Sequence, residues 1–579
     1  MNSALLVSLG FVIFYLGYRF YSRSIASRIY ATDENIVTPA HEFRDEVDYV
    51  PTKRHILFGH HFTSIAGAAP IIGPCVAAYW GWLPAFLWVV LGTVFMGAVH
   101  DFGALVVSVR EKGRSIADVT GRIVSGRARV MFLIFILMLI WLVLAVFAMV
   151  IADLFILVPS TVLPINIEIV IALAIGWILY KTKTGALVPS LTALVVLYLF
   201  VWIGTHYPLG FDSLGLSRES SSTLWVVILF AYSAMASLLP VWLLLQPRDY
   251  INSHQLFVGL GLLYLGIFVA QPVIDAPVFR AVSEPTAPPM FPLLFVTIAC
   301  GAISGFHGLV ASGTTSKQVS SMKDTRLLGY GAMLGEGTLA LASTIAAVAG
   351  IALLSRCNLP SVGEVENLSW SVYYDTWAHA SANKAAAFVL GGGALMEKVG
   401  IPAQLAQTLV AVLVISFAAT TLDTATRIQR FVLTELGMAL QVKPLTNRFF
   451  ATALAVLPAA FLALWNVTDP ATGNARQAGW VLWPIFGASN QMLAALTLMI
   501  LTLYFWQRKK PIAPLVIPML FIMVVTLITL VLKTGDFYAS NKSLFVINSL
   551  LIVLIGWMIL EGVLVVIRSK RFAEATTKG

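Results

Sequence analysis

The chain has 579 residues, of which 59% are hydrophobic and 11% are charged, whereas a typical soluble domain is about 25% charged. This composition excludes a cytosolic enzyme, a secreted enzyme and a disordered scaffold, and predicts an all-α polytopic membrane protein. The net charge of +9 requires no nucleic-acid partner, because Lys and Arg are enriched in the cytoplasmic loops of membrane proteins.

About 15 hydrophobic segments are long enough to cross a bilayer, since a spanning helix takes about 20 apolar residues. The first is expected to be retained as a span, because basic residues follow it and no small-residue cleavage site is evident. Segment 384–401 is interrupted by glycines and carries Glu397 and Lys398, so we expect it to be re-entrant or peripheral. In chain order the predicted spans are 3–20, 57–82, 84–109, 130–158, 166–181, 186–204, 223–246, 255–275, 291–316, 327–354, 403–426, 449–466, 480–506, 511–533 and 545–567.

The basic residues indicate the orientation of these spans, because basic loops near span ends remain in the cytoplasm. One set of alternate loops, which includes Arg248, carries 29 of the 37 Lys and Arg residues, and the other set carries eight. Adding or removing one mid-chain span would destroy this segregation. We therefore expect the N-terminus outside and the C-terminus inside the cell.

Three regions follow from this topology. Residues 1–56 form the first span and a cytoplasmic loop, residues 57–426 a transporter core, and residues 427–579 the last membrane helices with a short basic tail. The core contains two blocks of five spans, 57–204 and 223–426, which must be inverted relative to each other. Inverted repeats are typical of secondary transporters.

The first chemical motif is GHHFTSIAGAAPIIGP, residues 59–74. Its prolines and glycines predict an interrupted helix, and unwound backbone at membrane depth is tolerated where it lines a cavity or binds an ion. The alternative is a proline-kinked packing helix with its histidines at the membrane surface. Candidate substrate-binding residues here are His61, Ser64, Gly67 and Ala68.

The second motif is SGFHGLVASGTTS, residues 304–316. Ser312, Thr315 and Ser316 would share one helical face, where their hydroxyls can ligate sodium or hold a carboxylate. Close helix packing would explain the small residues but not His307, whose side chain titrates near neutral pH. The candidate substrate-binding residues of this motif are Ser304, Gly305, His307, Ser312, Thr314 and Thr315, with a possible sodium site at Ser312 and Thr315.

Asp101, Glu336 and Asp423 are carboxylates within predicted spans, where each ionised group costs about 2.5–3.5 kcal/mol or more. Low dielectric raises the proton affinity of a carboxylate, which suits proton coupling. The coupling candidates are His307, Asp101, Glu336 and Asp423. Structural hydrogen bonds are the alternative for Asp101 and Glu336, and an i, i+4 ion pair with Arg427 is the alternative for Asp423.

Other chemistries have little support in the sequence. The motifs HExxH, GxxxxGK[ST] and GxSxG are missing, which argues against a metalloprotease, an ATP-driven pump and a serine hydrolase. Cys75, Cys300 and Cys357 have no metal-binding or disulfide spacing. We expect no cofactor and no resident metal.

Six motifs in order along residues 55–503 resemble the carbon starvation protein A family: GHHFTSIAGAAPIIGP, GAVHDF, SGFHGLVASGTTSK, LLGYGAMLGEG, TTLDTATRIQRFVLTEL and WPIFGASNQMLAALTL. The resemblance implies an inner-membrane permease for peptides or, in some members, for pyruvate with protons. It also implies a fold related to the amino acid-polyamine-cation superfamily. The chain departs from the expected pattern at Ser316, where proline is expected, and at His100, where glutamine is expected.

We therefore predict a secondary transporter of the bacterial inner membrane that imports small peptides or pyruvate, driven by protons rather than sodium. The substrate would bind between the interrupted span near Ser64 and the span that carries His307. A nutrient-sensing receptor without net transport is the main alternative. A channel, or an enzyme that uses His60, His61, His100 and His307 as metal ligands, are further alternatives.

Overall fold

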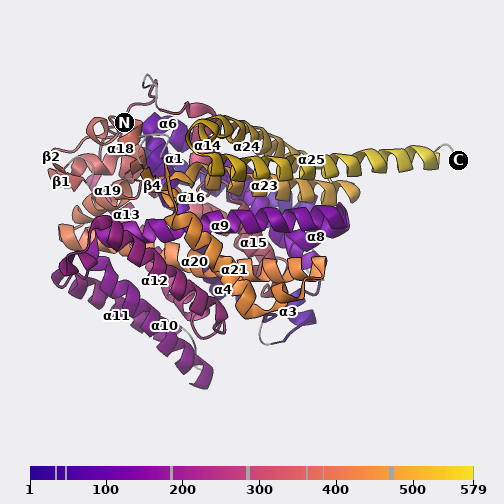
Figure 1. The fold of residues 1–579 in the computed structure, drawn as a ribbon, viewed down its shortest axis with the longest axis horizontal. Coiled ribbons are helices and arrows are strands. Elements are labelled where there is room, and N and C mark those ends of the chain that lie inside the picture. Colours follow the sequence, from indigo (N-terminus) through magenta and orange to yellow (C-terminus); the bar gives the residue numbers. More distant parts are fainter. Residues whose placement is uncertain are drawn as a thin grey trace.

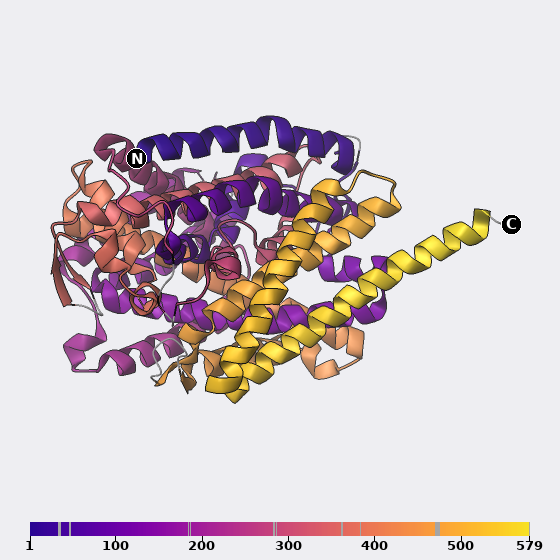
Figure 2. The same ribbon diagram turned by 90° about the horizontal axis from the view of Figure 1, so that it is seen from above.

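The computed structural model describes the whole chain except residues 33–35, 46–47, 183–184, 186, 282–283, 285–286, 360–362, 383, 469–474 and 578–579. Most of the described chain is helical, and the helices pack into one bundle (Figure 1). The N-terminal helix lies along one edge of this bundle, and the end of the last helix extends beyond its body (Figure 2).

Twelve helices of the described chain are long and apolar enough to cross a membrane. Several are composite, with π-helical or 3-10 turns joining shorter α-helices. They are Ser3–Tyr30 (α1, Ser3–Leu16, and α2, Ser22–Ile25), Trp82–Arg110 (α6, Trp82–Leu87, and α7, Ala98–Arg110), α9 (Gly126–Leu157), Pro159–Thr182 (α10, Val162–Thr182), α11 (Leu187–His206), α12 (Arg218–Leu238), α13 (Leu245–Ala270), Arg326–Leu353 (α16, Ala332–Ile345), α20 (Ala403–Leu440), α23 (Trp483–Gln507), α24 (Ala513–Ser540) and α25 (Lys542–Thr577).

A thirteenth span is present if one bent pair of helices is counted. Helix α4 (Arg54–Ile65) and helix α5 (Ala69–Ala77) meet at a break and are bent by 49°. Pro70 lies in the first turn of α5, where its missing N–H has no helical partner to lose. The interruption predicted for segment 57–82 is confirmed.

The predicted continuous span 291–316 is wrong. Helix α14 (Met290–Thr297) ends at Ile298, and α15 (Gly305–Gly313) begins after a non-helical stretch. A Cβ on Gly305 would lie 2.5 Å from the backbone oxygen of Asn490, so only glycine permits this approach of α15 to α23. Because α15 ends at Gly313, Ser312 and Thr315 do not share one continuous helical face.

Segment 449–466 also falls short of a full span. Helix α21 (Arg448–Leu464) has 17 residues, or about 25 Å at 1.5 Å per residue, against about 30 Å of hydrocarbon. With the bent pair counted, the described chain has 13 candidate spans against 15 predicted, and the two missing ones are segments 291–316 and 449–466.

Short elements complete the described fold. Helix α19 (Ala386–Glu397), from the segment expected to be re-entrant or peripheral, is buried, and its Gly391 lies against the backbone of Ala346. The remaining elements are α3 (Pro39–Glu42), α8 (Ile116–Ile123), α17 (Trp370–Tyr373), α18 (Trp377–Ala382), α22 (Ala478–Val481), the antiparallel pair β1 (Arg356–Leu359) and β2 (Gly363–Glu366), and the antiparallel pair β3 (Asn466–Thr468) and β4 (Ala475–Gln477).

The helices differ in how far the bundle encloses them. The apolar stretch of α23 is completely buried, whereas those of α11 and α25 are 33% and 22% buried. Exposed apolar side chains on the outer helices are the expected surface toward lipid tails, which are as apolar as leucine. Helix α23 therefore lies in the interior of the bundle, away from the lipid-facing surface.

Candidate functional site

His307 lies between two carboxylates in the interior of the bundle. Its Nδ1 is 2.9 Å from Asp101 Oδ2, and its Nε2 is 3.1 Å from Glu336 Oε2. Asp101 lies on α7, His307 on α15 and Glu336 on α16, and each side chain is at most 1% exposed. The interrupted helix thus places one imidazole where it links three segments distant in sequence.

The position of the His307 ring between two carboxyl groups suits a charged imidazole. A neutral imidazole has one N–H donor, whereas a charged imidazole has two. Both ring nitrogens of His307 lie within 3.1 Å of a carboxylate oxygen, and only the Nδ1 contact meets hydrogen-bond geometry. Neither oxygen of Glu336 forms a hydrogen bond that meets normal geometry with a described residue, which leaves this carboxyl group able to exchange partners.

His100 adds a second imidazole on the opposite side of Asp101. His100 Nδ1 is 2.7 Å from Asp101 Oδ1, and its Nε2 has no hydrogen-bond partner among the described residues. A Cβ added to Gly308 would lie 3.1 Å from the His100 ring. The glycine in α15 therefore allows His100 to approach the helix that carries His307.

Asn490 holds the beginning of α15. Its side-chain oxygen accepts a hydrogen bond from Phe306 N at 2.9 Å, and its nitrogen donates to Ser304 Oγ at 3.0 Å and to Cys300 Sγ at 3.1 Å. The first N–H groups of a helix have no partner within the helix, so the amide from α23 supplies one. Asn490 is thus a positioning residue for His307.

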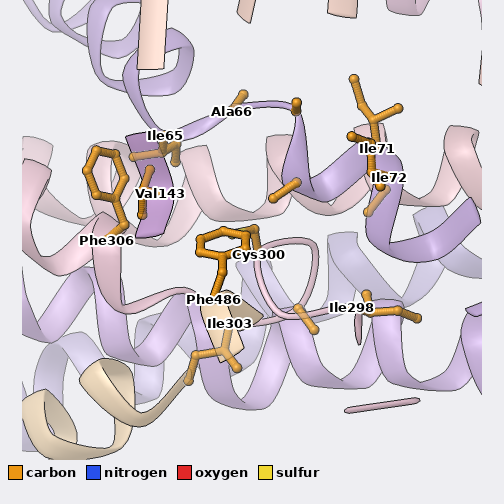
Figure 3. Packing of buried hydrophobic residues seen from close by; sticks show 14 of the residues in the cluster. Ile65, Ala66, Ile71, Ile72, Val143, Ile298, Cys300, Ile303, Phe306 and Phe486 are labelled. Atoms are coloured by element: carbon orange, nitrogen blue, oxygen red, sulfur yellow. The ribbon is translucent and has the colours of Figure 1, made fainter. Parts of the chain in front are cut away.

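A small cavity lies between the two interrupted helix pairs. It has a volume of about 10 Å³, enough for about one water molecule. Thr421, whose buried hydroxyl has no hydrogen-bond partner among the described residues, is part of its wall. Figure 3 shows apolar side chains around both breaks, with Ile65 and Ala66 at the first and Cys300 and Ile303 at the second. The wall consists of Ile65, Gly67, Ala69, Pro70, Val143, Phe147, Cys300, Ser304, Phe306, His307, Thr421, Phe486 and Asn490.

A separate buried network surrounds Arg248 on α13. Arg248 Nε donates to Glu168 Oε1 at 2.9 Å, and Nη1 donates to Asp423 Oδ2 at 2.7 Å and to the Tyr232 hydroxyl at 2.8 Å. Tyr232 also donates to Asp423 Oδ2 at 2.8 Å, and Ser416 donates to Glu168 Oε2 at 2.7 Å. The guanidinium group thereby joins α10, α12, α13 and α20.

Two predictions are corrected by this network. Arg248 is 1% exposed within a helix and is not a loop residue, because α13 begins ten residues earlier than the apolar pattern predicts. Asp423 pairs with Arg248 instead of Arg427, whose Nη2 donates to the backbone oxygens of Ala236 and Leu239.

The predicted substrate-binding residues do not converge on one cavity. Gly67, Ser304 and His307 line the small central cavity, whereas Ser64 and Thr314 line a second cavity of about 70 Å³ beside His60 and Asp249. The other five, His61, Ala68, Gly305, Ser312 and Thr315, line neither cavity.

The hydroxyls proposed for sodium already have protein partners. Thr315 Oγ1 is 2.8 Å from His61 Nδ1. Ser312 Oγ donates to Gly308 O at 2.6 Å and accepts a hydrogen bond from Ile116 N at 3.2 Å. Among the residues that the structure describes, no group of three or more His, Cys, Asp or Glu side chains is arranged to hold a metal ion.

Sequence reasoning missed Arg248, Glu168 and Asp249 as interior residues. The run QPRDYINSH lowers the hydropathy of the segment at the start of α13 and therefore resembles a loop. One signal was available, because Glu168 lies inside the predicted span 166–181 and a carboxylate at membrane depth requires a cationic partner. Asn490 lies in the motif WPIFGASNQMLAALTL, but its partners at the beginning of α15 were not predictable.

Known proteins are similar to this chain over most of its length. The chain is 32% identical to "Peptide transporter CstA" of Campylobacter jejuni, covering 94% of this chain and 82% of that protein. It is also 32% identical to "Pyruvate/proton symporter BtsT" of Escherichia coli, covering 93% and 84%. A solved manganese transporter of Eremococcus coleocola is 13% identical with a TM-score of 0.46, covering 91% of this chain and 99% of that chain, a likeness too low to support an argument.

The fold and these relatives define a polytopic helical membrane protein of a transporter class. The family model described as "Carbon starvation protein CstA" matches residues 2–529. The chain belongs to the carbon starvation protein CstA family, which confirms the resemblance found in the six sequence motifs.

Proposed function

We propose that this protein is a secondary transporter that imports small peptides or a small carboxylate such as pyruvate, and that protons rather than sodium drive it. The two relatives carry the names of a peptide transporter and a pyruvate/proton symporter. Transport, not catalysis, is the proposed activity, in agreement with the missing hydrolase and ATPase motifs.

The observation that carries the proposal is the position of His307. The imidazole bridges Asp101 and Glu336 and also lines the central cavity between the two interrupted helix pairs. A proton held in this cluster is therefore adjacent to the space where unwound backbone is available to a substrate. His307 is the first coupling candidate, followed by Asp101 and Glu336; Asp423 is the fourth, although it contacts Arg248.

The substrate carboxylate would bind at the beginnings of α5 and α15. Each of these helices starts at an interruption, and a helix N-terminus presents free N–H groups with a partial positive charge. The central cavity must widen for this, because its present volume of about 10 Å³ is far smaller than any substrate. Alternating access by movement of one helix group against the other supplies that widening.

The proposed arrangement in the membrane follows the sequence prediction. The N-terminus lies outside and the C-terminus inside the inner membrane of a bacterium, and the core resembles the amino acid-polyamine-cation superfamily. Segments 57–204 and 223–426 are the proposed inverted repeats, and each contains one interrupted helix pair. One interrupted helix pair in each proposed repeat supports a symmetric core, in which the two broken helices are related and face each other.

Uptake by purified protein in liposomes tests the proposal. Labelled pyruvate and a labelled dipeptide are supplied under an imposed pH gradient and then under an imposed sodium gradient. Accumulation that collapses with a protonophore is the expected result. No accumulation of either substrate by folded protein would contradict transport of these substrates and favour a receptor that senses them.

A further inference from the structure

A second polar cavity of about 70 Å³ lies beside the first interrupted helix pair. Its wall combines residues of α4, α13, α15 and α20 with the segments after α3 and α15. An adjoining cavity of about 310 Å³ shares His60, Gln246 and Gln318 with it. Together they provide space for a molecule larger than the central cavity accommodates.

Asp249 is the unusual member of this wall. It is 1% exposed, and its Oδ2 lies 2.9 Å from His60 Nδ1, while its Oδ1 has no hydrogen-bond partner among the described residues. A buried carboxylate oxygen without a partner is strongly destabilising unless a donor reaches it. An ammonium group in the cavity would supply this donor.

Two cationic side chains line the same cavity. Lys317 is partly buried, with its Nζ 5.4 Å from the centre of the Tyr49 ring, and it forms no ion pair with a described residue. Arg427 donates from Nη2 to backbone oxygens, and its buried Nε has no partner among the described residues. Cationic groups therefore remain available for a carboxylate.

We propose that this cavity is a recognition site for zwitterions, in which Asp249 binds the free ammonium group of a short peptide and Lys317 with Arg427 binds its carboxylate. The proposal deepens, and rests on, the proposed transport function, because it selects peptides over pyruvate as the substrate class. The wall carries Asp48 and Asp249 as well as Lys317 and Arg427, so its charges balance. A zwitterion complements such a wall, whereas pyruvate has no ammonium group to satisfy Asp249 and is repelled by it.

Direct binding to the purified protein tests this site independently of transport. Titration calorimetry compares alanyl-alanine, its N-acetylated form, its C-terminal amide and pyruvate on wild type and Asp249→Asn. We expect Asp249→Asn to weaken alanyl-alanine binding by about tenfold or more, since a charge-assisted hydrogen bond is lost. N-acetylation is expected to weaken binding to wild type but to have little effect on the variant.

Matched variants keep the test decisive. Asp324→Asn removes a carboxylate from the segment after the 3-10 turn of Thr315–Lys317, and Asp324 does not line the cavity, so this variant should bind as wild type does. Lys317→Gln, at a partly exposed position, should abolish the preference for alanyl-alanine over its amide. This variant provides a readout even if Asp249→Asn does not fold.

Three outcomes would overturn the proposal: equal binding of free and acetylated dipeptide by wild type, binding of pyruvate as tight as that of the dipeptide, or no binding of any of the four compounds. Dipeptide binding that depends on Asp249 without any uptake into liposomes would support the site while contradicting the transport function. The two hypotheses can therefore fail separately.

Discussion

The two buried ionic networks differ in the helices that hold their charged side chains. Arg248 directs three hydrogen bonds to Glu168, Asp423 and Tyr232, all from long helices. His307 instead contacts Asp101 and Glu336 from a nine-residue helix that starts at a break, and the Glu336 carboxylate accepts no well-formed hydrogen bond from a described residue. The Arg248 guanidinium group thus links four long helices, whereas His307 lies beside a cavity at a helix break, where we propose that a proton exchanges.

The sharpest test of the comparison is His307→Ala. We expect uptake to fall at least about a hundredfold, because the group that carries the proton between Asp101 and Glu336 is removed. The protein should remain folded in the membrane, since Asp101 keeps its 2.7 Å contact with His100 Nδ1 when the His307 ring is lost. Liposome uptake and size-exclusion chromatography measure the two effects. Uptake within twofold of wild type would remove His307 from the mechanism.

Arg248→Ala, unlike His307→Ala, should lower the stability of the folded protein. Removal of the cation leaves Glu168 and Asp423 buried without it, a change that destabilises by about 3–5 kcal/mol. We expect a large fall in thermal stability in detergent and little folded protein. Arg248→Lys is the matched control and should be intermediate, since an ammonium group cannot reproduce the two-sided guanidinium geometry. A fully stable but transport-inactive Arg248→Ala protein would show that this network also belongs to the transport cycle.

Glu336→Gln should separate coupling from movement of substrate. The amide is nearly the same size but cannot exchange a proton, so accumulation under a pH gradient should fall about tenfold. Exchange of labelled for unlabelled substrate at equal concentrations should continue, because that process needs no net proton movement. Loss of both activities to the same degree would contradict a coupling role and indicate a role in substrate binding or folding.

Tyr232→Phe should have the smallest effect. The variant loses the hydroxyl that donates to Asp423 and accepts from Arg248, while the direct contact of Arg248 with Asp423 at 2.7 Å remains. The expected loss is about 1 kcal/mol of stability, with unchanged uptake. Thermal unfolding in detergent measures it. A fall in uptake without a fall in stability would show that the Arg248 network also takes part in transport.

The membrane class and most spans were predictable, because an apolar run of about 20 residues is long enough to cross the hydrocarbon core as a helix. The interruption in segment 57–82 was also predictable from its prolines. The break in 291–316 was not, because residues 298–304 contain no proline and are apolar enough to continue a helix. Contacts from α23 that require Gly305, and the amide of Asn490, decide that break.

The coupling candidates were predictable as single residues, but their contacts with one another were not. His307, Asp101 and Glu336 were recognisable individually, since each is ionisable within an apolar segment. Their mutual contact was not predictable, because three helices from residues 98 to 345 must pack before any of them meet. Arg248 was hidden for the same reason: its partners lie 80 and 175 positions away along the chain.

The small size of the central cavity has a consequence for the energy supply of the cell. Protons leak rapidly through continuous files of water, but a space of about 10 Å³, lined in part by Phe147, Phe306 and Phe486, holds about one water molecule. In this conformation the central cavity is too small to hold a continuous file of water. A cell could therefore insert many copies into its membrane without discharging the voltage across it.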